Sequence, residues 1–213
     1  MPCLGHDGGT GIKQEAITYK TVLFTLLLYC GLILLFTLIG VVFAPPPAQI
    51  GGTRPTDTIS GHVLELGGFG LLLGLGLAAF YGRKGLPLAF LMPVLTVLLD
   101  LDHLPAYLGI PETIRPAHSF VFIIAALAIT AITIKRPEVD LVVLSATMAH
   151  MGIDTGLFAP FSPLNFDYYQ LDTYRVPLLV GAILTVLAGG YLLRRRGSRA
   201  GPTRKESAKS ALP

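Results

Sequence analysis

The chain has 213 residues, of which 52% are hydrophobic and only 14% charged, and its mean hydropathy is +0.65. Soluble domains carry about 25% charged residues, so this composition excludes an ordinary soluble fold and a disordered chain alike. The apolar residues come in long blocks, which predicts an all-α, polytopic membrane protein.

Six apolar blocks predict about six transmembrane helices. In chain order they are Thr21–Phe43, Val63–Tyr81, Leu86–Leu99, Ser119–Ile134, Leu141–Phe161 and Val176–Leu193. A cleaved signal peptide is the alternative for the first block, but its apolar stretch would be too long and Pro45 follows immediately. The third block is too short to span alone, so it must continue into residues 100–103 or end in a cavity lined by protein.

The distribution of Lys and Arg predicts the orientation. With six spans, 13 of the 16 Lys and Arg residues fall on the side that carries both termini and the loops at 82–85 and 135–138. We therefore expect a plasma (inner) membrane protein with cytoplasmic termini. Residues 1–20 form a cytoplasmic segment, residues 21–193 the transmembrane domain, and residues 194–213 a basic, disordered tail.

Four polar clusters interrupt the apolar pattern, and the predicted topology brings them to similar depths on the extracytoplasmic side. They are Ser60-Gly61-His62 with Glu65 one turn later, Asp100-Leu101-Asp102-His103, Arg115-Pro116-Ala117-His118-Ser119, and the segment from Ala149 to Thr155 that carries His150 and Asp154. Ionisable residues inside a span cost about 2.5–3.5 kcal/mol each on insertion scales, so they are usually functional.

The spacing within these clusters suits metal coordination. His150 and Asp154 are four residues apart, so both would project from one helix face. Imidazole and carboxylate together favour a divalent transition metal such as Zn²⁺ or Mn²⁺ over Mg²⁺ or Ca²⁺. The predicted ligands are His62, Asp102, His103, His118, His150 and Asp154. This set exceeds what one ion needs, so either two ions bind or some of these residues hydrogen-bond to the ligands without contacting the ion.

Asp100 and Glu65 are the predicted catalytic residues, as a general base or as partners of the ligands. Each has a simpler interpretation. Asp100 could belong to a turn that ends a helix, and Glu65 could make a hydrogen bond between helices.

The same clusters resemble the motifs of a known family, the LexA-binding, inner-membrane-associated hydrolases, also called membrane-bound metal-dependent hydrolases. The similar segments are Gly61-His62, Asp100-Leu101-Asp102-His103, Ala117-His118-Ser119 and His150-Met151-Gly152-Ile153-Asp154, followed by Pro160-Phe161-Ser162-Pro163. The resemblance covers roughly residues 60–165. It departs in the third motif, where Thr113 replaces a His, Ile114-Arg115 replaces Arg-Gly and Ala117 replaces a Thr.

The resemblance implies a metal-dependent hydrolase, and the LexA-binding label is not carried over to this chain. A site near the outer face would meet membrane lipids, so a lipid or lipid-linked phosphate is the expected substrate class. We expect no nucleic acid partner. Two alternatives stay open. Intramembrane His and Asp residues also suit an ion or proton transporter or channel, and a basic tail suits a non-catalytic membrane scaffold.

Overall fold

The computed structural model describes residues 17–44, 59–110, 115–154 and 157–199, and these form an all-α protein, as the composition predicted. Its α-helices are α1 (Tyr19–Phe43), α2 (Ile59–Tyr81), α3 (Leu86–Leu98), α4 (Leu104–Tyr107), α5 (Phe120–Thr133), α6 (Pro137–Ile153) and α7 (Asp172–Arg199). Short 3₁₀ segments cover Gly82–Gly85, Leu99–His103 and Pro116–His118. Strands β1 (Leu157–Phe158) and β2 (Tyr169–Gln170) pair antiparallel, with Leu157 opposite Gln170.

Within the described residues, four helical segments are long and apolar enough to cross a membrane: α1, Val63–Tyr81 of α2, Leu86–His103, and Asp172–Arg195 of α7. The third of these joins α3 to the 3₁₀ segment after it, which is the continuation that the short third block required. The other two predicted spans correspond to α5 and α6, with 14 and 17 residues. Both are shorter than the roughly 20 residues that a typical span needs.

Two predicted boundaries are wrong. The fifth block was expected to stay helical to Phe161, but α6 ends at Ile153 and Asp154 is its C-cap, with extended backbone. The chain then enters β1, and turns follow over residues 160–164. The second boundary is that of the C-terminal tail, which was expected to be disordered from residue 194. Helix α7 continues to Arg199, so the first residues of this tail are helical.

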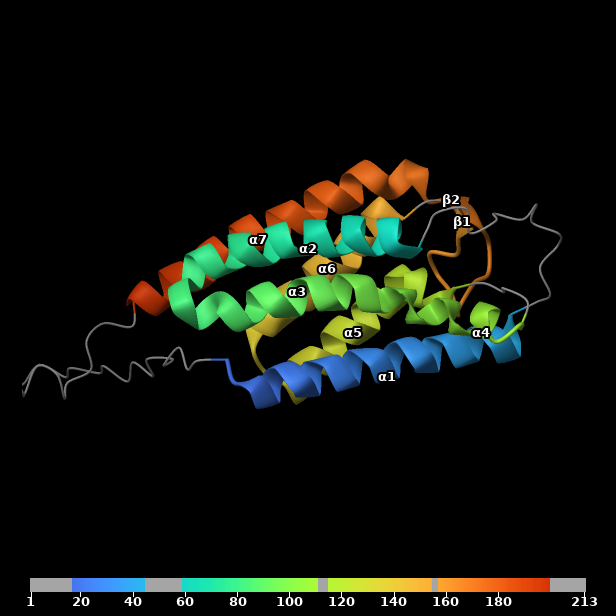
Figure 1. Ribbon diagram of the computed structural model, residues 1–213, viewed down its shortest axis with the longest axis horizontal. Coiled ribbons are helices and arrows are strands. Elements are labelled where there is room, and N and C mark those ends of the chain that lie inside the picture. Colours follow the sequence, from blue (N-terminus) through green and yellow to red (C-terminus); the bar gives the residue numbers. More distant parts are fainter. Residues whose placement is uncertain (1–16, 45–58, 111–114, 155–156, 200–213) are drawn as a thin grey trace, which may run out of the picture.

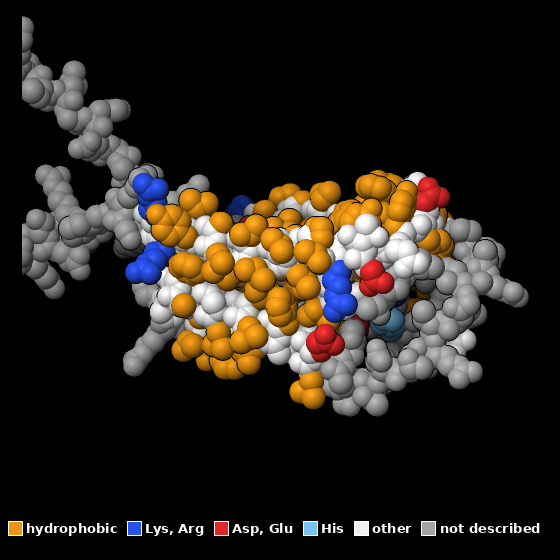
Figure 2. All heavy atoms as spheres, turned by 90° about the horizontal axis from the view of Figure 1, so that it is seen from above, with side chains coloured by type: hydrophobic (Ala, Val, Ile, Leu, Met, Phe, Trp, Pro, Cys, Tyr) orange, Lys and Arg blue, Asp and Glu red, His pale blue; other side chains and the backbone are white. Residues whose placement is uncertain are grey.

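The long helices lie side by side along one axis of the molecule (Figure 1). The start of α1, the end of α7 and the α2–α3 and α5–α6 connections lie at one end, whereas α4, β1 and β2 lie at the other. Figure 2 shows apolar side chains over the middle of one face, with acidic side chains toward the end that carries α4 and the strands. We call this end the polar end.

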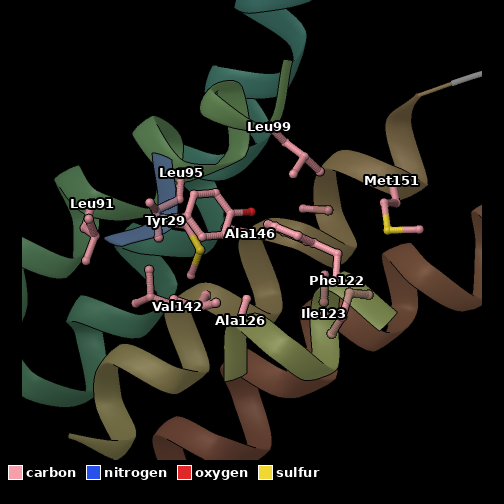
Figure 3. Close-up of a cluster of buried hydrophobic side chains, with 14 of the residues drawn as sticks. Tyr29, Leu91, Leu95, Leu99, Phe122, Ile123, Ala126, Val142, Ala146 and Met151 are labelled. Atoms are coloured by element: carbon pink, nitrogen blue, oxygen red, sulfur yellow. The ribbon is translucent and has the colours of Figure 1, made fainter. Parts of the chain in front are cut away.

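An apolar core joins α1, α3, α5 and α6 beneath the polar end (Figure 3). Tyr29, Leu95, Phe122, Val142 and Met151 have no exposed surface there. The hydroxyl of Tyr29 bonds to Thr147 Oγ1 at 2.8 Å and so ties α1 to α6. The polar side chains described next therefore lie next to a buried, mainly apolar core.

The α2–α3 crossing depends on small residues. A Cβ added to Gly74 would lie 2.9 Å from Ala89 Cα, and one added to Gly70 would lie 2.8 Å from Pro93 Cα. Such distances are below van der Waals contact, so only glycine allows the two backbones to approach this closely. The crossing fixes α3, whose last turn and following 3₁₀ segment carry residues of the candidate site.

Candidate metal centre

His118 is held at the start of α5 by local capping. Ser119 is the N-cap of that helix, and its Oγ accepts a hydrogen bond from Phe122 N at 3.0 Å and donates one to Pro116 O at 2.7 Å. The amide of Phe120 also donates to Pro160 O at 2.8 Å, which ties the helix start to the turn after β1. Because Ser is among the best N-cap residues, His118 is placed directly before the first helical turn.

Asp102 fixes the ring of His118. Its Oδ2 lies 2.6 Å from His118 Nδ1, and both side chains are fully buried. A carboxylate can only accept, so Nδ1 carries the proton. In the neutral ring the lone pair is then on Nε2, and an Asp–His pair of this kind commonly orients a metal-binding imidazole.

A backbone carbonyl fixes the ring of His150 in the same sense. His150 lies in the last turn of α6, and its Nδ1 is 2.6 Å from the carbonyl oxygen of Thr96. Thr96 lies in the last turn of α3, where carbonyl oxygens lose their intrahelical partners. A carbonyl oxygen only accepts, so the Nδ1 of His150 donates and its Nε2 holds the lone pair.

The two Nε2 atoms face each other 2.8 Å apart, with carboxylates close by. Asp100 Oδ1 lies 3.6 Å from His150 Nε2, and Asp154 Oδ2 lies 3.3 Å from His118 Nε2. Asp100, His118 and His150 could hold a metal ion, because one ligand atom from each lies within 4.8 Å of the others. We call these four residues (Asp100, His118, His150 and Asp154) the inner cluster.

Arg115 lies beside the inner cluster and joins two of the predicted ligands. Its Nη2 donates to Asp154 Oδ2 at 2.7 Å, and its Nη1 donates to His103 Nε2 at 2.8 Å. Arginine has no acceptor, so His103 must receive this hydrogen bond through the lone pair of Nε2. In this geometry that nitrogen of His103 is therefore engaged by Arg115.

The charges of the site are strongly coupled. Burial raises the pKa of Asp154, but Arg115 and His118 outweigh burial and hold this pKa well below its usual range. Burial and Arg115 lower the pKa of His118, but Asp102 and Asp154 oppose them and raise it to about 9. The His118 shift reflects the carboxylates around its ring, and the Asp154 shift reflects the positive groups beside its carboxylate.

The structure thus brings together the polar residues of three of the four predicted clusters. The residues that meet are Asp100, Asp102, His103, Arg115, His118, His150 and Asp154. Their arrangement differs from the prediction in two respects. Asp102 lies behind His118 rather than among the facing ligand atoms, and Asp100, expected as a base, lies on the facing side.

The remaining predicted residues do not join this site. Glu65 is exposed on α2, and within the described part of the chain no contact connects it with the inner cluster, so its catalytic role stays a prediction. His62 lies in α2, but its side chain is outside the described residues, as is Thr113.

Sequence reasoning did not assign roles to Arg115 and Thr96. Arg115 stands three residues before His118, and a cation in the same polar cluster as a predicted metal ligand was the available signal. Thr96 acts through its backbone carbonyl, which no side-chain pattern can reveal.

Comparisons with protein-family models, with curated proteins and with solved structures gave no match to the chain. What the cluster can do therefore follows from its own geometry.

Proposed function

We propose that this chain is a multi-pass membrane protein whose inner cluster binds a divalent transition metal and supports hydrolysis. The observation that carries the proposal is the pair of facing Nε2 atoms, 2.8 Å apart. When both rings are neutral, as ligands of a metal ion must be, Asp102 and the Thr96 carbonyl direct their Nε2 lone pairs toward each other. Two lone pairs at this distance repel unless a proton or a cation lies between them, so the arrangement suits a metal ion.

The local charge also supports a divalent cation. Asp100, Asp102 and Asp154 bring three carboxylates, against which Arg115 is the fixed positive charge in the described site. Asp102 Oδ1 is buried without a hydrogen-bond partner among the described residues. Buried anions are costly unless they are paired, so a 2+ ion would offset charge that the protein itself leaves uncompensated.

Each residue then has a distinct role. Asp100, His118, His150 and Asp154 are the proposed ligands, which suit Zn²⁺ or Mn²⁺ better than an ion that prefers only oxygen. Asp102 and the Thr96 carbonyl hold the two imidazoles in the required tautomer and orientation. A bound ion would supply an activated water and polarise a phosphoryl or acyl oxygen, the chemistry of a metal-dependent hydrolase. The resemblance to membrane-bound metal-dependent hydrolases agrees with this assignment.

We further propose six spans, with α5 and α6 as the two short ones. At ~1.5 Å per residue, 17 residues of α6 approach the lower limit for crossing a ~30 Å hydrocarbon layer. Both helices run alongside the four longer segments (Figure 1), which supports their crossing the same layer. The excess of Lys and Arg on the side of the termini supports cytoplasmic termini, a plasma (inner) membrane location and a site at the extracytoplasmic face.

The interior between the site and the opposite end favours hydrolysis over transport. A transporter needs a polar route through the membrane. Below the inner cluster many of the described buried side chains are hydrocarbon, including Leu91, Val142 and Ala146, and the buried polar ones are hydroxyls. The buried hydroxyls of Thr147 and Ser145 are bonded to backbone carbonyls. The buried histidines and carboxylates of the described residues, Asp102, His118, His150 and Asp154, are thus on one side.

Metal binding by the purified full chain tests the proposal. The protein is stripped with a chelator, reloaded with Mn²⁺ or Zn²⁺, and its metal content measured after gel filtration in detergent. We expect a stoichiometric ion in the wild type and its loss in His150→Ala. His103→Ala is the matched control, because His103 faces Arg115, and it should retain the ion.

Hydrolysis is then assayed on phosphoryl and acyl ester substrates, and turnover should require the ion. Thermal unfolding without metal checks that the variants fold. A folded wild type that binds no stoichiometric transition metal would contradict the proposal. A His150→Ala variant that keeps the full metal content of the wild type would contradict it too.

A further inference from the structure

We propose that Arg115 is the residue that binds the substrate, and that the group it binds is a phosphoryl group. The inference rests on the proposed metal site and names the substrate class of that site. It depends on three features of the described residues: which side of the cluster is open, what chemistry lies on that side, and what Arg115 does to the charge.

The cluster is open on the side of Arg115. The side chains of Asp102, His118 and His150 are fully buried. Exposure rises through Arg115 (15%) and Asp100 (22%) to His103 (28%). Among the described residues, Asp100, His103 and Arg115 are therefore the side chains past which a substrate would reach the inner cluster.

Arg115 is held in place at this opening. Its two terminal nitrogens are fixed by hydrogen bonds to His103 and Asp154, which set the plane of the guanidinium. Asp154 Oδ2 is in turn 3.3 Å from His118 Nε2, so the guanidinium lies one carboxylate away from the proposed ion. A planar guanidinium presents N–H groups in a geometry that matches the oxygens of a phosphoryl group.

The charge of the site explains why an arginine is required there. The three carboxylates of the site, of which Asp100 and Asp154 are partly exposed and Asp102 is buried, would repel any anion. A bound divalent ion together with Arg115 brings the formal sum of these groups to zero, whereas without Arg115 the loaded site stays negative. Arg115 therefore decides whether an anionic phosphoryl group can approach the ion. A neutral ester would not need this fixed cation.

Binding of inorganic phosphate to the Mn²⁺-loaded full chain tests the inference. Mn²⁺ is paramagnetic and shortens the ³¹P relaxation time of phosphate bound beside it. We expect a clear enhancement in the wild type and at least about tenfold weaker phosphate binding in Arg115→Gln, with Mn²⁺ content unchanged. Arg115→Lys keeps the charge but loses the planar fork, so its phosphate affinity should fall between the two.

Arg175→Gln is the matched control, because Arg175 lies exposed in the first turn of α7 at the same polar end. It should leave both Mn²⁺ and phosphate binding unchanged. Mixed micelles that contain phosphatidic acid or neutral diacylglycerol then identify the source of the phosphoryl group. Displacement of phosphate by phosphatidic acid alone assigns a lipid headgroup, and displacement by neither assigns a soluble phosphate compound.

The outcomes separate the two proposals. A wild type without bound Mn²⁺ contradicts the metal site itself. A wild type that binds Mn²⁺ and an Arg115→Gln variant with unchanged phosphate relaxation leave the metal site standing and overturn the role of Arg115. Loss of Mn²⁺ in Arg115→Gln also overturns it, because Arg115 would then only hold Asp154 in place.

Discussion

Asp100 and Asp102 are two residues apart and chemically identical, yet they approach the histidines in different ways. Asp102 bonds to the Nδ1 of His118, whereas Asp100 lies 3.6 Å from the Nε2 of His150. The 3₁₀ geometry of Leu99–His103 produces this difference, because three residues make one turn and alternate positions point in different directions. The sequence analysis assigned both residues to the candidate site. Their roles, however, depend on the 3₁₀ geometry, which the spacing of residues did not predict.

This difference makes the two aspartates separable by experiment. Asp102→Asn keeps the size of the side chain but weakens the hydrogen bond to His118 Nδ1. Substitution of a residue that hydrogen-bonds to a metal ligand typically lowers metal affinity about 10- to 100-fold. Asp100→Asn removes a proposed ligand oxygen and its charge, so its loss should be larger. Isothermal titration of the stripped variants with Zn²⁺ measures both affinities. Equal losses, or a larger loss in Asp102→Asn, would assign Asp102 to the ion and contradict our arrangement.

At the scale of the elements, helix positions followed from the sequence more reliably than helix ends. The predicted block Ser119–Ile134 matches α5, because Ser119 caps its start and Ile134 its end. The end of α6 was missed, since apolar residues continue to Phe161 and hydropathy does not register the turn. The missed end places Asp154 on a C-cap rather than on the helix face shared with His150. The carboxylate reaches the site nonetheless, because it directly follows the last turn of α6.

The packing of α2 against α3 should control the metal site from a distance. Gly74→Ala places a Cβ 2.9 Å from Ala89 Cα, so the helices must separate, and overpacking of this kind costs about 1–3 kcal/mol. Because α3 carries the Thr96 carbonyl and leads into Asp100, we also expect weaker metal binding. Thermal unfolding in detergent and Zn²⁺ titration are the measurements.

Gly68→Ala is the matched control for this substitution. Gly68 lies on the same helix, and a Cβ added there meets nothing within 4 Å. Alanine is favoured over glycine in a helix by up to about 1 kcal/mol, so this variant should be as stable as the wild type or more so. If Gly68→Ala and Gly74→Ala unfold alike, close packing of α2 and α3 does not limit stability.

At the scale of the whole molecule, charge is scarce and segregated. The composition alone indicated a membrane protein, and Figure 2 shows basic side chains at one end of an apolar body and acidic and histidine side chains toward the other. Asp100, Asp102 and Asp154 lie together at that end, whereas Lys135, Arg136 and Arg194 belong to segments at the other. The meeting of the three carboxylates was predictable only through the membrane topology, because no local pattern relates segments so far apart in sequence.

The proposed topology predicts opposite labelling of the two ends. In a variant without Cys3 and Cys30, single cysteines replace Leu164, which is 81% exposed at the polar end, and Lys135, which is exposed in the α5–α6 connection. A membrane-impermeant maleimide should label Leu164→Cys in intact cells and Lys135→Cys only after permeabilisation, because Lys and Arg mark the cytoplasmic side. A count of four spans would leave α5 and α6 on one side of the membrane. Labelling of both cysteines in intact cells, or of neither, would therefore contradict six spans and remove the argument for a site at the extracytoplasmic face.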